Sequence, residues 1–188
     1  MRHLLVVLGL VAAGAALAGC ELIGRGEPKL LYRVNCGADK DYVDDDGTVW
    51  KADQVWADGQ DWGAVNGQVV HRAGIETIAG TPAPGVYLDE RYSMAAYRFK
   101  APNGTYTVHL HFAETYDGIT AAGERVFSVQ VEGKTVLENL DVFKETGKFA
   151  KPLVKKVSGV EVSDGELTID FVENTQNPEI NGIEVFQH

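Results

Sequence analysis

Residues 104–118 read Gly-Thr-Tyr-Thr-Val-His-Leu-His-Phe-Ala-Glu-Thr-Tyr-Asp-Gly. Large apolar residues occupy every second position, at Tyr106, Val108, Leu110 and Phe112. They alternate with Thr107, His109, His111 and Ala113. A period of two is typical of a strand with one face in a core and the other half exposed. We therefore predict a central antiparallel strand over residues 106–114, followed by a short aromatic loop that ends at the turn-forming Asp117 and Gly118.

Beyond residue 30 the pattern is that of an all-β domain. Further strands are predicted at residues 30–35, 92–100, 125–132, 134–137, 154–162, 166–173 and 179–186. Gly, Pro, Asn and Asp separate most of them, and no stretch has helical periodicity with caps. Short strands at this spacing predict a two-sheet antiparallel β-sandwich of jelly-roll type. Residues 37–89 alternate poorly, so we interpret them as long ordered loops, where binding sites often lie.

Length and composition are consistent with one domain behind a leader. The 188 residues are 45% hydrophobic and 9% aromatic, which is enough for a sizeable core. The formal net charge of −10 argues against a nucleic-acid partner, because neutralising phosphates requires clustered Lys and Arg. An acidic surface of this kind is more often a matter of solubility than of function.

Residues 1–19 are predicted to be a secretory signal peptide, because a short polar start precedes an apolar run that is too short for a membrane span. The sequence Leu-Ala-Gly-Cys at residues 17–20 resembles the lipobox of bacterial lipoproteins. That resemblance implies acylation of Cys20 and, from Glu21, delivery to the outer membrane, on its periplasmic or surface face. Residues 20–29 would then be a tether of at most about 30 Å. The alternative is an ordinary signal peptide with a chance Cys.

Cleavage before Cys20 would leave the folded domain, residues 30–188, with Cys36 as its one thiol besides the acylated residue. A disulfide within the domain is therefore excluded. Cys36 lies in an apolar segment, so we expect it to be a buried small hydrophobe.

Six short motifs follow one another along residues 31–185. They are Arg33-Val34-Asn35-Cys36-Gly37, Val43-Asp44-Asp45-Asp46-Gly47-Thr48-Val49-Trp50 with Ala52-Asp53, Tyr106 to Glu114, Arg125-Val126-Phe127-Ser128-Val129, Leu140-Asp141-Val142-Phe143 and Ile180-Asn181-Gly182-Ile183-Glu184-Val185. Together they resemble the malectin and malectin-like domain family. The resemblance implies a β-sandwich that binds carbohydrate, in the animal protein a glucosylated oligosaccharide, and in bacteria often a module attached to polysaccharide-acting proteins.

The same resemblance implies a set of carbohydrate-binding residues. Trp62 matches an aromatic that lines the site from the first long loop, and Tyr92 matches a tyrosine that follows Glu-Arg. An aromatic pair after the central strand is matched by Tyr116 and, less well, by Asp117. Gln176 replaces an acidic residue before Asn-Pro. Three aromatics are thus retained, whereas one stacking group is lost and one carboxylate becomes an amide. The resemblance therefore does not imply which sugar this chain binds.

The residue types alone also favour a sugar site. A pyranose ring has an apolar face and a rim of hydroxyls, so its site needs flat aromatics flanked by planar polar groups. Asp61, Asp117 and Gln176 are such polar groups beside the aromatics. Covering about 50 Å² of sugar per aromatic contributes about 1.3 kcal/mol, which predicts affinities on the order of micromolar to millimolar. The alternative is packing, with Trp62 under its own loop and Tyr92 at the start of its strand.

Metal sites are weaker interpretations, and no metal or other cofactor is predicted. Asp41, residues 44–46 and Asp53 offer oxygens for calcium, but their order fails the EF-hand template, so a solvated turn is favoured. His109 and His111 share a strand face at a spacing that could chelate zinc. No Cys or third His is near them in the sequence, and exposed strand histidines are the favoured interpretation.

An enzyme that cleaves glycans would need paired carboxylates, such as Glu114 with Glu90 or with Asp117. Nothing in the sequence sets such a pair at a workable separation, and there is no nucleophile elbow, phosphate loop or dinucleotide fingerprint. We therefore predict a non-catalytic, membrane-anchored domain that binds an oligosaccharide or polysaccharide. The alternative is a protein-interaction or scaffold module of the cell envelope, if the changes at Asp117 and Gln176 have closed the site.

Overall fold

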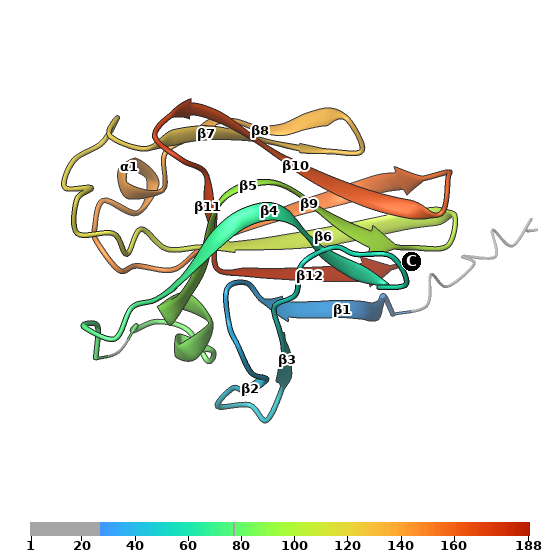
Figure 1. Ribbon diagram of the computed structural model, residues 1–188, viewed down its shortest axis with the longest axis horizontal. Coiled ribbons are helices and arrows are strands. Elements are labelled where there is room, and N and C mark those ends of the chain that lie inside the picture. Colours follow the sequence, from blue (N-terminus) through green and yellow to red (C-terminus); the bar gives the residue numbers. More distant parts are fainter. Residues whose placement is uncertain (1–26, 77) are drawn as a thin grey trace, which may run out of the picture.

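Two β-sheets face each other in the computed structural model (Figure 1), which describes residues 27–76 and 78–188. In order across the first sheet lie β2 (Tyr42–Val43), β3 (Val49–Ala52), β1 (Lys29–Asn35), β12 (Gly182–Gln187), β6 (Gly104–Phe112) and β9 (Leu153–Val162). Across the second lie β11 (Glu179–Ile180), β5 (Asp89–Lys100), β10 (Glu166–Thr175), β7 (Val126–Val131) and β8 (Lys134–Leu140), and β4 (Trp62–His71) also pairs with β5. The predicted all-β sandwich is confirmed.

The alternating stretch forms β6, which pairs antiparallel with β12 on one side and with β9 on the other. Its four large apolar residues, Tyr106, Val108, Leu110 and Phe112, are completely buried between the sheets. They pack in one continuous core with residues of the second sheet such as Phe127 and Ile169. The alternation therefore places β6 as predicted.

The opposite face of β6 is less exposed than predicted. His111 is only 8% exposed, because the loop that contains the 3-10 helix η1 (Pro84–Leu88) covers it. The Tyr87 hydroxyl lies 2.8 Å from His111 Nδ1, and Glu184 lies 3.1 Å from His111 Nε2. A buried imidazole is stable here because both of its nitrogens have a partner. The interpretation of both histidines as exposed is wrong for His111.

Residues 37–89 are not only loops, so the prediction of long ordered loops over this region is wrong in part. They contain β2, β3 and the ten-residue strand β4, which runs beside β5 from Trp62, opposite Phe99, to His71, opposite Asp89. Asn66 and Gly67 have φ of 64° and 88°, and the β4–β5 register shifts between Val65 and Asn66. A bulge of this kind interrupts the period of two, so alternation could not reveal this strand.

One short helix, α1 (Val142–Thr146), was also missed. Asp141 caps it by accepting a hydrogen bond from the Lys144 backbone N–H at 2.8 Å, and Gly147 ends it in the left-handed region. Five residues are little more than one turn, so they carry no periodicity to detect.

Three of the acidic residues considered for calcium, Asp41, Asp44 and Asp53, have structural partners. Asp44 accepts hydrogen bonds from the backbone N–H of Thr48 and from the Trp50 indole, at 2.8 and 3.0 Å. Asp53 is buried and forms an ion pair with Arg91 at 2.6 Å. Within residues 27–76 and 78–188, no three His, Cys, Asp or Glu side chains are grouped so as to hold a metal ion. Cys36 is free and completely buried, as predicted.

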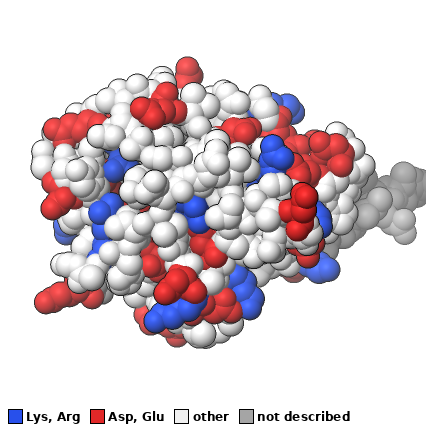
Figure 2. All heavy atoms as spheres, in the orientation of Figure 1, with Lys and Arg blue, Asp and Glu red and all other residues white. Residues whose placement is uncertain are grey.

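The signal peptide, Cys20 and most of the tether lie outside the described residues. In the part of the chain that is described, no helix is long and apolar enough to cross a membrane. Figure 2 shows acidic and basic side chains interspersed over one face of the described residues, with a broad uncharged area between them and no continuous basic surface on that face.

Candidate functional site

A cavity of about 280 Å³ opens where β4 ends, β5 begins and β10 passes to β11. Eight residues line it: Val70, Arg72, Glu90, Tyr92, Tyr116, Arg125, Gln176 and Asn177. They come from five separate parts of the chain, so the cavity exists only in the folded sandwich. Two aromatic rings, two side-chain amides and two guanidinium groups are its distinctive chemistry.

Strand pairing sets the position of Tyr92. It lies opposite Gln68 of β4 and Glu179 of β11, so β5 is held from both sides at this point. Glu90 is two residues earlier on the same strand and therefore points to the same face. Ser93 then donates a backbone hydrogen bond to the Pro178 carbonyl at 3.0 Å, which holds the β10–β11 connection against β5.

Gln176 and Asn177 form the far wall of the cavity. Gln176 has φ of 63°, in the left-handed region where a side chain is unusual. Its side-chain oxygen accepts a hydrogen bond from the Asn177 backbone N–H at 3.1 Å, which stabilises this tight turn. Gln176 is exposed, and its amide nitrogen remains available to a ligand.

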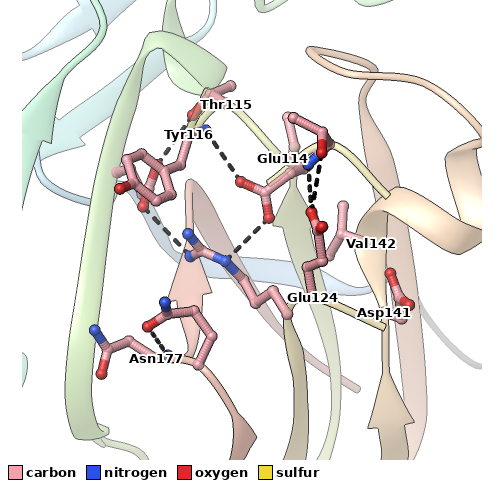
Figure 3. Close-up of polar contacts among 12 residues, drawn as sticks. Glu114, Thr115, Tyr116, Glu124, Asp141, Val142 and Asn177 are labelled. Carbon is pink, nitrogen blue, oxygen red and sulfur yellow. Dashed lines mark hydrogen bonds and ion pairs between the residues drawn. The ribbon is translucent and has the colours of Figure 1, made fainter. Parts of the chain in front are cut away.

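Tyr116 lies at the mouth of the cavity, in the loop that follows β6 (Figure 3). Its backbone N–H donates to Glu114 at 3.0 Å, and its ring is 40% exposed. The guanidinium carbons of Arg72 and Arg125 lie 5.6 and 6.0 Å from the ring centroid. A Cβ at position 118 would be 2.5 Å from the Tyr116 ring, so Gly118 is required for this position of the ring.

Buried ion pairs form the floor of the cavity. Arg72 donates to Glu90 at 2.8 Å, and Thr115 links these two side chains by donating to Glu90 and accepting from Arg72 Nε. Arg125 Nε lies 3.0 Å from Glu114, although its N–H does not point at the oxygen, so the contact is an ion pair without hydrogen-bond geometry. Glu90 and Glu114 are each only 1% exposed. Each arginine thus lines the cavity and is also paired with a buried carboxylate.

Two of the glutamates have raised pKa values. Burial raises the pKa of Glu114 to about 6, against the opposite effect of Arg125. Glu179 is completely buried, neither carboxyl oxygen has a hydrogen-bond partner among the described residues, and burial together with Glu90 raises its pKa well above the usual range. Burial favours the neutral form of a carboxyl in this setting because its charged form is poorly solvated.

Three of the predicted site residues meet in this cavity, namely Tyr92, Tyr116 and Gln176. Asp117 is exposed beside Tyr116 but does not line the cavity. Trp62 and Asp61 are at the other end of β4, roughly 20–26 Å from the cavity at the usual rise of a strand.

At that end of β4 both residues have partners of their own. Trp62 stacks on Phe99 with a centroid distance of 6.3 Å and an interplanar angle of 14°. Asp61 forms an ion pair with Lys100 at 3.1 Å. The single site expected from all six residues is therefore not what the fold assembles.

The sequence reasoning missed the two arginines, and it considered Glu90 only as a catalytic partner of Glu114. Arg125 begins one of the six family motifs, so its motif could have indicated it. Arg72 follows β4, a strand that alternation did not reveal. Glu90 and Glu114 share Arg125 as a partner, at 3.7 and 3.0 Å. Carboxylates held in this way are better suited to fixing the arginines than to acid–base chemistry on a ligand.

Comparison with known proteins identifies the family of the chain. The family model described as the malectin domain matches residues 30–185. The chain belongs to this family. This malectin domain is 33% identical over 170 residues to receptor-like protein 4 of Arabidopsis thaliana, covering 82% of this chain and 27% of the relative. It is 28% identical over 149 residues to malectin of Mus musculus, covering 77% of this chain and 48% of the relative.

Solved structures with the same fold include parts of larger proteins. A Bacteroides uniformis beta-glucuronidase, covalently bound to cyclophellitol-6-carboxylate aziridine, has a TM-score of 0.74 and 26% identity, covering 84% of this chain and 18% of that one. The plant receptor FER in complex with the peptide RALF23 and LLG2 has a TM-score of 0.67 and 25% identity, covering 84% of this chain and 48% of that one. This malectin domain thus spans at most about half of each of these four proteins.

Proposed function

We propose that this malectin domain binds carbohydrate non-covalently, in the cavity lined by Tyr92, Tyr116 and Gln176. The observation that carries the proposal is the convergence of two aromatic rings and two side-chain amides on one hollow. Domains of this family are carbohydrate-binding and receptor modules. Aromatic faces cover the apolar face of a sugar, and amides bind neighbouring hydroxyls as donor and acceptor at once.

Size and geometry favour recognition of a short part of a glycan. Small-molecule pockets commonly have volumes of about 300–1,000 Å³, and the cavity is close to the lower limit. Two stacking contacts of about 50 Å² each contribute roughly 2.5 kcal/mol before polar contacts. The fixed ion pairs below Tyr116 reduce the ordering cost of binding, because the ring does not need to be immobilised. Affinity in the micromolar to millimolar range follows.

The proposal includes a lipid anchor at Cys20, based on the signal-like residues 1–19 and the lipobox-like residues 17–20. The start of β1 lies at the end of the sandwich opposite β11, which borders the cavity (Figure 1). An anchor preceding β1 would therefore direct the cavity away from the membrane of the cell envelope. Mass spectrometry of the membrane fraction should find an acylated Cys20, and a soluble chain with a different amino terminus would contradict the anchor.

A second candidate function is binding of a protein or peptide partner. It is favoured by the similarity to FER, whose structure was solved with a peptide and a second protein. A partner that remains bound after both cavity tyrosines are replaced would support this second function.

The proposed function is tested by a glycan-array screen of the full chain carrying Cys20→Ser, which prevents acylation. The variant Tyr92→Ala/Tyr116→Ala is screened beside it, with Trp62→Phe as the matched aromatic control outside the cavity. We expect a coherent set of glycans to bind the parent protein and Trp62→Phe, and not the double variant. Circular dichroism of all three proteins checks that the fold is retained. Absence of binding by the folded parent protein would contradict the proposal.

A further inference from the structure

We propose that the cavity selects saccharides with an anionic substituent, a carboxylate or a sulfate, which Arg72 and Arg125 bind directly. This inference rests on the proposed carbohydrate binding and specifies the class of sugar. It starts from the two guanidinium groups that line the cavity. The chain as a whole has a formal charge of −10, so a pair of arginines in its candidate binding site is a local exception.

Each guanidinium uses only part of its donor set within the protein. Arg72 donates from Nη2 to Glu90 and from Nε to Thr115, whereas Arg125 Nε and Nη1 lie in ion pairs with Glu114 and Glu90 that are not hydrogen bonds. Arg72 Nη1 and Arg125 Nη2 have no hydrogen-bond partner among the described residues, and neither is among the buried atoms that lack one. These two nitrogens are therefore left for the cavity.

The carboxylates that hold the arginines do not compete for this surface. Glu90 and Glu114 are almost completely buried, and the oxygens of Glu90, which also lines the cavity, lie next to Arg72, Thr115 and Arg125. Arginine has donors but no acceptor, and a guanidinium matches the oxygens of a carboxylate or sulfate. The floor thus presents donors to a ligand, and the ligand group that matches them is an acceptor with negative charge.

The charge of the cluster is balanced without a ligand. Arg72 is paired with Glu90, and Arg125 with Glu114 and Glu90, while burial raises the pKa of Glu179 and so favours its neutral form. An anion therefore meets no uncompensated negative charge at the floor. A ring resting on the exposed part of Tyr116 would lie beside both guanidinium groups, which are within about 6 Å of the Tyr116 centroid. One substituent can then reach them while the sugar face stacks.

Protonation of Glu114 gives this preference a pH dependence. The groups facing Glu114 are Arg125, Arg72, Glu90 and Glu179. The pKa of Glu114 is about 6, so between pH 7.5 and 5.5 it takes up a proton and the cluster becomes more positive. Sugar carboxylates, like other free carboxyls, stay ionised over this interval because their pKa is near 3–4. An anionic ligand should bind roughly three- to tenfold more tightly at pH 5.5 than at 7.5, and a neutral ligand should not.

The test is isothermal titration of the full chain carrying Cys20→Ser with matched saccharide pairs at low salt. One pair is a uronic-acid oligosaccharide and its carboxyl-reduced form, and the other is a sulfated oligosaccharide and its desulfated form. We expect the anionic member of at least one pair to bind at least tenfold more tightly. The pair that shows the difference identifies carboxylate or sulfate as the recognised group.

Arg72→Gln should remove most of this preference while changing the affinity for the neutral form by less than threefold. Arg98→Gln is the matched control, because Arg98 is on β5 beside Glu166 and outside the cavity. If Arg72→Gln does not fold, the salt dependence of saccharide binding by the protein without that substitution is measured in its place. Raising the salt concentration from 20 to 500 mM should weaken anionic binding at least fivefold and leave neutral binding unchanged.

The outcomes separate this inference from the function on which it rests. Equal affinity for the charged and neutral members of both pairs would overturn the anionic preference and leave carbohydrate binding intact. No binding of any saccharide by the folded protein would overturn both. Tighter binding of the neutral members would also contradict the role of the two arginines.

Discussion

The two ends of the β4–β5 ribbon each carry exposed aromatic surface, but they differ in what lies beneath it. At one end Trp62 stacks on the completely buried Phe99 and so extends the core outward. At the other end Tyr116 rests beside the guanidinium groups of Arg72 and Arg125. An aromatic ring on an apolar support is part of the packing, whereas a ring on a polar, fixed support leaves a hollow beside it.

The polar support has a cost that the apolar end does not have. Burying Glu90, Glu114 and Glu179 together is costly, because two of the carboxylates need arginine partners and burial shifts the third, Glu179, toward its neutral form. Such clusters seldom improve stability over apolar packing. A cluster with this cost is consistent with the ligand binding proposed for that end.

The largest expected effect comes from removing the central cation of the polar end. Arg125→Ala leaves Glu114 and Glu90 buried with less compensation, so the free energy of unfolding should fall by about 3–5 kcal/mol. Urea denaturation of this variant and of Arg98→Ala measures the difference, because Arg98 forms a partly exposed ion pair with Glu166 outside the cavity. A loss below 1 kcal/mol would show that the cluster is not held by Arg125.

A smaller loss is expected at the apolar end. Trp62→Ala removes a half-buried ring from Phe99, and the free energy of unfolding should fall by about 2–3 kcal/mol. Saccharide affinity should stay within twofold, because Trp62 does not line the cavity. If affinity were lost while the protein remained folded, the contrast between the two ends would be wrong.

The pH dependence of stability sharpens the contrast further. Burial raises the pKa of Glu114 from 4.5 to about 6, so the folded state binds a proton more tightly than the unfolded state. Glu114 therefore adds stability as pH falls through 6, in full below about pH 4.5, and by about 2 kcal/mol in total. Between pH 4.5 and 7.5, the free energy of unfolding of the parent protein should rise more steeply with falling pH than that of Glu114→Gln. Identical slopes would contradict the raised pKa.

The smallest expected effect concerns the position of the Tyr116 ring. Gly118→Ala puts a Cβ against that ring and should move it away from the cavity. Saccharide affinity should decrease about tenfold, equivalent to about 1.4 kcal/mol, with little change in stability. Gly123→Ala is the control, because nothing lies near its Cβ position, although its φ of 90° gives it a backbone cost of its own. Unchanged affinity in Gly118→Ala would mean that Tyr116 is not a stacking surface.

Much of the sandwich was predictable, because its long strands alternate regularly. β6 is the clearest case, with every second residue completely buried. β4 was not predictable from alternation because Asn66 and Gly67 interrupt it with positive φ values, and α1 was too short to show a period. These failures are local, so they did not affect the fold class.

The site was predictable only in part, because it depends on distant segments meeting. Tyr92, Tyr116 and Gln176 were expected from the family resemblance, and the fold brings them to one cavity. Trp62 is aromatic like Tyr92 and Tyr116 but lies in different surroundings, and surroundings are a property of the fold. The pairing of Arg72 with Glu90 depends on where β4 ends relative to β5, which the sequence pattern did not reveal.

The most direct test is a two-dimensional NMR titration of the full chain carrying Cys20→Ser with a saccharide selected by the array. The backbone amides of Tyr116, Gly118 and Asn177 report on the cavity, and the Trp62 indole N–H reports on the apolar end. We predict that the cavity signals shift with ligand concentration while the Trp62 indole signal stays in place. Shifts centred on Trp62, with the cavity signals unchanged, would contradict carbohydrate binding at the polar end.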